Sequence, residues 1–134
     1  MTNDAEILEM LRAAKTIAVV GLSSKRLRPS NGVAAYLQQQ GYRIIPVNPV
    51  ETEVLGEKAY ASLREVPEKI DIVDVFRQPD AVPEVVDEAI AIGAPYLWLQ
   101  EGVVHEGAAA KARAAGMKVV MDRCILTEHR RLRL

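Results

Sequence analysis

The chain has 134 residues, of which 49% are hydrophobic and 26% charged, and its net charge is −1. This composition is typical of a globular protein, and the length favours one domain, residues 1–134, built on a single core. The sequence holds one cysteine and no apolar run near the roughly 18 residues that a membrane span needs. Its acidic start is unlike a signal peptide, so we expect a cytoplasmic protein without disulfides, a zinc cluster or a membrane-spanning segment.

The charges are unevenly distributed along the chain. No acidic residue lies between Glu9 and Glu51, so residues 10–50 carry +6 and the rest of the chain carries −7. A nucleic-acid-binding surface usually spreads positive charge along a face and interleaves aromatic residues, but aromatics make up only 4% here. The one tight basic cluster, Lys25, Arg26 and Arg28, therefore favours a small anionic ligand over nucleic acid. A chance grouping on a mixed surface is the alternative.

Short β-rich runs alternate with helical patterns from one end of the chain to the other. The predicted strands are 16–20, 42–47, 71–76, 96–100 and 118–121. Pro46 in the second run indicates an edge strand or an irregularity. Residues 48–69 are predicted to be mostly loop, with a short helix around 62–66.

The helices are located by their caps and by apolar residues at helical spacing. The first begins at Asn3, the second is capped by Ser30 and ends at Gly41, the third is capped by Asp80 and ends at Gly93, and the fourth lies near 106–115. The basic tail that ends in Arg130, Arg131 and Arg133 is expected to be a solvated or dimer-contacting end.

Strands separated by helices predict an α/β protein with a Rossmann-like, doubly wound and mainly parallel five-stranded sheet, with helices on both faces. The simplest strand order is 3-2-1-4-5. Ligands of such sheets bind beyond the carboxyl ends of the strands, at the switch point beside the first strand. The corresponding chain segments are Gly21–Ser24, Asn48–Pro49, Arg77–Pro79, Gln100–Gly102 and Asp122–Cys124.

The loop after the first strand is the most informative of these segments. Gly21 lets the backbone turn sharply beside a ligand, and the hydroxyls of Ser23 and Ser24 can join the amides and dipole of the next helix in holding a phosphate. Lys25 and Arg28 add cationic donors. The alternative is a polar, glycine-containing turn without a ligand.

The same loop disfavours NAD and a Walker-type nucleotide site. The dinucleotide fingerprint G-x-G-x-x-G would need glycine at the positions of Ser23 and Arg26, and an acidic residue after the second strand, where Asn48 stands. No G-x-x-x-x-G-K-[ST] sequence occurs. The ligand is expected to be phosphorylated and nucleotide-like.

Five motifs together resemble a known family. TIAVVGLSSK, GYRIIPVNP, DIVDVFRQP, YLWLQEGV and VVMDRC, in this order, resemble the small stand-alone CoA-binding proteins, which are similar to the N-terminal CoA-binding domain of the succinyl-CoA synthetase α subunit. The resemblance covers about residues 5–130. It implies a Rossmann-like domain that holds CoA across the strand ends.

The resemblance also implies a part for each strand end. The phosphates would face Gly21, Ser23, Ser24 and Lys25; the adenosine would lie against Asn48 and Pro49; the pantetheine would pass Phe76, Arg77 and Pro79; and the far wall would be Gln100, Glu101 and Gly102. The synthetase pattern has a lysine after the second strand where this chain reads VNPVETE, so Lys25 or Arg28 would have to serve the adenosine phosphate. The ligase half of that subunit, with its phosphorylated histidine, is absent.

Cys124 stands at the rim of this predicted site. A thiolate there could form a mixed disulfide with CoA, whereas the alternative is a small buried apolar residue without reactivity. His105 and His129 are isolated, Trp98 is expected in the core, and one of Asp71 and Asp74 is expected to cap a sheet end.

The sequence therefore predicts a protein that binds CoA or an acyl-CoA, without catalytic activity or metal, and that could form homo-oligomers or serve as a subunit of a partner enzyme. The alternatives are a small nucleotide-dependent enzyme, such as an oxidoreductase or an acyl-CoA-processing protein, and a regulatory nucleotide-binding domain.

Overall fold

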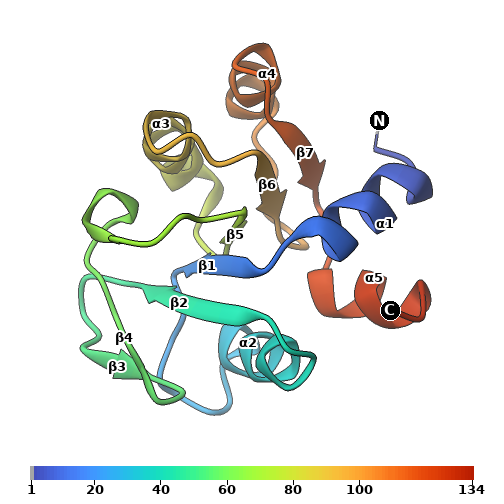
Figure 1. Cartoon of the computed structure of the whole chain (residues 1–134). Coiled ribbons are helices and arrows are strands. Elements are labelled where there is room, and N and C mark those ends of the chain that lie inside the picture. The colour runs from blue at the N-terminus through green and yellow to red at the C-terminus, as the bar shows by residue number, and fades with distance from the viewer. Residues whose placement is uncertain (1) are drawn as a thin grey trace.

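The computed structural model describes residues 2–134 and contains one five-stranded sheet in which all neighbouring strands are parallel (Figure 1). The strands, in spatial order, are β2 (Arg43–Val47), β1 (Thr16–Val20), β5 (Ile72–Val75), β6 (Tyr96–Leu99) and β7 (Lys118–Met121). All five coincide with predicted strands to within a residue or two at either end.

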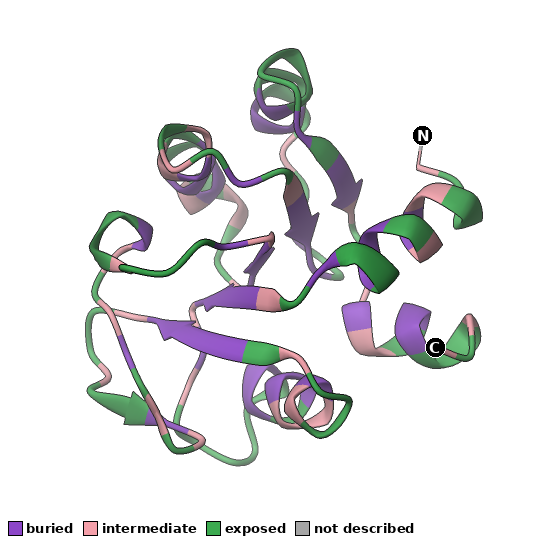
Figure 2. Cartoon of the chain, in the orientation of Figure 1, coloured by how far each residue is buried: buried purple, intermediate pink, exposed green. Residues whose placement is uncertain are grey.

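Helices cover both faces of the sheet, so the predicted Rossmann-like, doubly wound α/β fold is confirmed. On one face lie α1 (Asp4–Ala13), α2 (Pro29–Gln39) and α5 (Ile125–Arg131), and on the other lie α3 (Val82–Ala91) and α4 (Glu106–Ala114). The strands are almost entirely buried between these layers (Figure 2). Trp98 of β6 is fully buried, as expected.

The predicted strand order 3-2-1-4-5 is wrong, because the third strand along the chain, β5, pairs with β1 and not with β2. Pro46 supplies the physical reason. The carbonyl of Pro46 accepts from Tyr60 N on the outer side of β2, so the Pro46 nitrogen, which has no hydrogen, faces outward as well. A further strand could not pair fully with that side, and β2 is the edge strand that its proline indicated.

The segment between β2 and β5 is more ordered than predicted. It contains a short antiparallel hairpin of β3 (Glu53–Val54) and β4 (Glu57–Lys58), followed by the expected short helix, the 3-10 turn η1 (Leu63–Glu65). The hairpin was missed because each of its strands is only two residues long.

Two predicted helix caps are also wrong. Ser30 lies inside α2, which begins at Pro29, and Asp80 lies inside the 3-10 turn η2 (Pro79–Ala81) that precedes α3. In α2 the proline has the fixed φ that suits a first helical position and therefore sets the start of the helix. By contrast, Asn3 caps α1 as predicted, accepting from Glu6 N.

The three arginines of the basic tail are exposed, as expected for a solvated end, and Arg130 and Arg131 belong to α5. Arg131 binds Asp4 of α1 and Glu128 of its own helix, and the buried His129 ring contacts the hydroxyl of Tyr36 on α2 with an N–O distance of 2.7 Å. Burial lowers the pKa of His129 below its ordinary value. Among the helices of residues 2–134, none has the length and apolar character needed to span a membrane.

Candidate functional site

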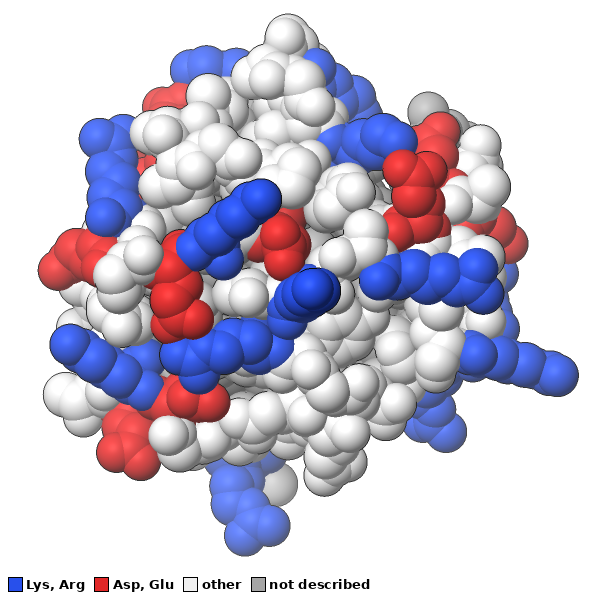
Figure 3. All heavy atoms as spheres, in the orientation of Figure 1, with Lys and Arg blue, Asp and Glu red and all other residues white. Residues whose placement is uncertain are grey.

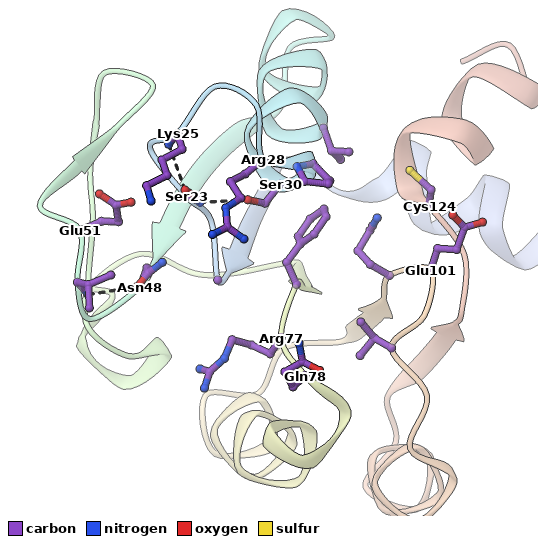
Figure 4. Close-up of a pocket in the computed structure, with 17 residues that line it drawn as sticks. Ser23, Lys25, Arg28, Ser30, Asn48, Glu51, Arg77, Gln78, Glu101 and Cys124 are labelled. Atoms are coloured by element: carbon purple, nitrogen blue, oxygen red, sulfur yellow. Dashed lines mark hydrogen bonds between the residues drawn. The ribbon is translucent and has the colours of Figure 1, made fainter.

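A cavity of about 710 Å³ opens above the carboxyl ends of the strands (Figure 4). At this point the loops after β1 and β5 lead to helices on opposite faces of the sheet. Lys25, Asn48 and Glu51 lie at one end of it, beyond β1 and β2. Glu101 and Cys124 lie at the other end, beyond β6 and β7. The cavity therefore runs across the sheet over the switch point, which is where ligands of doubly wound folds bind.

Gly21 brings the two central strand ends together at the floor of this cavity. Its φ is +91°, a left-handed conformation, and a Cβ at this position would lie 2.2 Å from the carbonyl oxygen of Phe76. Only glycine allows this approach, so the sharp turn predicted at residue 21 is confirmed.

The loop after Gly21 is held by its own side chains. Ser30 Oγ accepts from Ser23 N at 3.1 Å, Ser23 Oγ accepts from Lys25 N at 3.1 Å, and the Asn31 amide donates to Ser23 O at 2.9 Å. The phosphate cradle was predicted from the hydroxyls of Ser23 and Ser24 and the amides of the next helix, which are not the amides engaged here. The bonds made here fix the shape of the loop.

Glu51 occupies a further amide of that loop. Its Oε2 accepts from Ser24 N at 2.8 Å, so a carboxylate oxygen already lies where an anionic ligand could be held. No role in the site was predicted for Glu51 from the sequence. Its position four residues after β2, close to where other dinucleotide-binding folds carry an acid, was the available signal.

The cations of the loop are free to meet an anion. Lys25, Arg26 and Arg28 are exposed, and none of them forms a salt bridge with a carboxylate of residues 2–134. Lys25 and Arg28 line the cavity. Elsewhere, on the face seen in Figure 3, basic and acidic side chains are interspersed.

Asn48 ties the first loop to the end of β2. Its side-chain amide donates to Leu22 O at 3.1 Å, and its Oδ1 accepts from Val50 N at 3.1 Å. Both polar groups are thus in use, and the residue presents its remaining surface to the cavity.

The cavity is also lined by apolar side chains. Phe76 after β5, Val33 of α2 and Val103 after β6 all line it. This lining suits a neutral, partly apolar chain better than a charged group.

The structure brings most of the predicted site residues together. Those that line the cavity are Gly21, Ser23, Lys25, Arg28, Asn48, Phe76, Arg77, Gln100, Glu101 and Cys124. Pro49 lines a smaller adjoining cavity, whereas Ser24, Pro79 and Gly102 line neither. Gln78, inside the predicted segment Arg77–Pro79, also lines the larger cavity, and the lining residues that were not predicted are Pro29, Ser30, Val33, Val50, Glu51 and Val103. Several of these directly follow predicted positions, and Pro29, Ser30 and Val33 belong to the first turns of α2.

The two histidines and Asp71 have structural positions. His105 caps α4 by accepting from Ala108 N, and His129 is packed between α5 and α2. Asp71 accepts from the amides of Lys15 and Thr16 at 2.9 and 3.0 Å, so the expectation that one of the two aspartates caps a sheet end is confirmed.

Known proteins resemble this chain over most of its length. Residues 15–130 match the family model described as CoA binding domain. The uncharacterized protein YneT of Bacillus subtilis (strain 168) is 46% identical over 125 residues, which are 93% of each chain. A solved structure of a hypothetical protein from Pyrococcus horikoshii OT3 is 42% identical with a TM-score of 0.96, and the match covers 99% of this chain and 94% of that one.

A larger enzyme shares part of the chain. The ADP-forming acetate–CoA ligase II of Archaeoglobus fulgidus is 32% identical over 81 residues, a match that covers 59% of this chain and 12% of the ligase. The similarity concerns a small region of that enzyme. On the evidence of the family model, the fold and the switch-point cavity, the chain belongs to the CoA-binding domain family.

Proposed function

We propose that this protein binds CoA or an acyl-CoA in the cavity above the β1–β5 switch point, as a binding module. The observation that carries the proposal is a cavity lined by three cations without a salt bridge among residues 2–134, Lys25, Arg28 and Arg77, together with the apolar side chains of Val33, Phe76 and Val103. CoA has matching groups, since its phosphates are anionic and its pantetheine arm is neutral.

The loop could hold an anionic ligand, but one amide of the loop is first occupied by a carboxylate of the protein. Ser24 N already holds a carboxylate oxygen of Glu51. A phosphate oxygen could replace that carboxylate, and Lys25 and Arg28 would then neutralise the ligand. Glu51 would turn away because two anions cannot share one amide at low energetic cost.

The pantetheine arm would follow the apolar side chains of the cavity, past Phe76 and Val103, towards Glu101 and Cys124. In this arrangement Gln100 is a supporting residue, because its Oε1 accepts from Ile125 N at 3.1 Å and so fixes the start of α5. Acyl-CoA synthesis is not part of the proposal, since the matched region is only 12% of the related ligase.

Calorimetric titration with CoA, dephospho-CoA, NAD and ATP tests the proposal. We expect CoA to bind and NAD to bind much more weakly. Equal affinity for NAD would contradict the proposal and favour a nucleotide-dependent enzyme, and preferential binding of ATP would favour a regulatory nucleotide-binding domain.

The arginines of the loop provide a matched pair of variants. Arg28→Ala removes a cation that lines the cavity, and Arg26→Ala removes the same charge from an exposed neighbour that does not line it. We expect Arg28→Ala to weaken CoA binding by roughly tenfold or more, as for the loss of one charge-assisted contact. If Arg28 serves the 3′-phosphate, dephospho-CoA should be nearly insensitive to the same change. Equal losses for the two variants would argue against a specific contact of Arg28.

A further inference from the structure

Asp74 has a buried carboxyl group that makes no structural hydrogen bond among residues 2–134. It lies in β5, the central strand of the sheet, and is fully buried. Neither of its carboxyl oxygens has a hydrogen-bond partner among residues 2–134. A buried polar group without a partner is costly and calls for an explanation in function.

Asp74 lies below the floor of the cavity, on the face of the sheet that α5 and Cys124 cover. Side chains alternate along a strand, so Asp74 points to the same face as Phe76, which lies two residues further on and lines the cavity. Across the ladder Asp74 pairs with Trp98 of β6. Asp74 therefore lies one step below the cavity floor, beside Trp98.

Cys124 is held on the same face of the sheet, beyond the end of β6. Trp98 Nε1 donates to Arg123 O at 2.8 Å, and Ile125 N donates to Gln100 Oε1 at 3.1 Å. These two bonds fix the residues on either side of Cys124 above the end of β6. The thiol is half-buried and lines the cavity, so the expectation of a buried, inaccessible cysteine is not met.

The chemistry of the pair agrees with this geometry. Burial raises the pKa of the Asp74 carboxyl well above its ordinary value, and a negative charge on the Cys124 sulfur raises it further. The Asp74 carboxyl therefore keeps its proton to a higher pH than an exposed aspartate does. A protonated carboxyl is a hydrogen-bond donor, and neither oxygen of Asp74 is engaged with any partner among residues 2–134, the Cys124 sulfur included.

We propose that Cys124 is a thiol-exchange site for the sulfur of CoA, and that Asp74 is its positioning residue, donating a hydrogen bond to the thiolate. This inference rests on the proposed function, which brings the pantetheine arm to Cys124. The substrate class is a disulfide of CoA, which supplies the oxidising equivalent itself.

The reaction is a balanced exchange. The Cys124 thiolate attacks the CoA sulfur of the disulfide, a bond forms between these two sulfurs, and the disulfide bond to the other half breaks. The departing thiolate takes up the proton that Cys124 had released. One CoA remains attached to the protein as a mixed disulfide, and a thiol that reduces the mixed disulfide restores Cys124.

Intact-protein mass spectrometry after incubation with CoA disulfide tests the exchange. The native chain should gain one CoA, dithiothreitol should remove it, and Cys124→Ser should gain none. Calorimetry with reduced CoA separates the two proposals. Binding without adduct formation would overturn the exchange site and leave the proposed function intact, whereas absence of both would overturn the proposed function as well.

A second disulfide tests whether the cavity guides the reaction. Hydroxyethyl disulfide has the same reacting bond but no phosphates. The native chain should react faster with CoA disulfide, and Arg28→Ala should reduce that preference. Equal rates for the two reagents in the native chain would show a merely exposed thiol and overturn the proposal.

Variants at Asp74 test the positioning role. Asp74→Leu removes the donor and should slow the exchange about tenfold or more at neutral pH, which corresponds to losing one hydrogen bond to a charged group. It should also move the pH–rate profile to higher pH. Asp74→Asn retains an N–H donor and should restore much of the rate. Asp74→Val serves if the leucine variant does not fold.

The other charged groups around Cys124 are controlled in the same experiment. Glu101 and Arg28 line the cavity with Cys124, and Arg123 is directed to Glu128 at 2.8 Å. All three are retained in the Asp74 variants. An unchanged rate and pH profile in both Asp74→Leu and Asp74→Val would overturn the role of Asp74.

Discussion

Replacing Asp74 by asparagine should change the way in which the free energy of unfolding depends on pH. Asp74 is fully buried without a hydrogen-bond partner in residues 2–134, and burial raises the pKa of its carboxyl well above the ordinary value. The folded chain therefore keeps a proton that the unfolded chain releases near pH 4. Asparagine has nearly the same shape and no proton to release.

The sign and size of the effect follow from this difference. Above about pH 4 the folded state binds more protons at this site than the unfolded state, so the native chain loses stability as pH rises, by about 1.4 kcal/mol per pH unit. The loss ends when the pH passes the pKa of Asp74 in the folded chain. The unfolding free energy of Asp74→Asn minus that of the native chain should rise with the same slope and then level off.

Urea unfolding of both chains at a series of pH values measures this difference directly. Equal m values would show that both unfold as the same unit, so that the subtraction isolates the site. The pH at which the difference levels off measures the pKa of Asp74 in the folded chain. A difference that stays constant between pH 4 and 7 would refute the assignment of Asp74 as a buried carboxyl with a raised pKa.

Three further predictions concern other parts of the molecule. Gly21→Ala should destabilise the chain by several kcal/mol, because the added Cβ would lie 2.2 Å from a carbonyl oxygen. Gly32→Ala should instead stabilise α2 by about 0.5–1 kcal/mol, because nothing lies within 4 Å of the added Cβ. Denaturant titration measures both changes in unfolding free energy, and equal changes would contradict the close approach at Gly21. Glu51→Gln should tighten CoA binding in calorimetry, because it removes a carboxylate that competes for the loop amide; weaker binding would mean that Glu51 contacts the ligand favourably. Hydrogen bonds from Arg131 lower the pKa of Glu128 in the folded chain, so this pair stabilises the fold only while Glu128 is ionised. The stabilisation of the fold is complete above about pH 4.3, the pKa of glutamate in the unfolded chain, and is lost as the pH falls through the pKa of Glu128 in the folded chain. The destabilisation caused by Arg131→Met should therefore vanish in unfolding measurements at acid pH, and a deficit independent of pH would point to lost packing instead.

Much of the site could be predicted from the sequence because strand ends in a parallel sheet share one edge. Once the strands at 16–20, 71–76 and 96–100 were recognised from their apolar runs, their following residues had to meet there. Gly21 could be assigned its turn because a glycine directly after a buried strand has few other reasons to occur. The apolar strands, the cap at Asn3 and the edge position of Pro46 all depend on local chemistry, which the sequence carries in full.

Only the tertiary structure decided which strand lies beside β1, which amides remain available and which buried groups lack partners. The strand order depends on which side of β1 the chain returns to, and it is fixed by the pairing of β5 with β1. Glu51 reaches Ser24 across 27 positions of sequence, and Asp74 comes beside Trp98 through the register of β5 with β6. These relations join residues that are distant along the chain, and their energies depend on burial and direction. Local sequence patterns determine the elements and their caps, but the environment of each side chain exists only after the elements have packed.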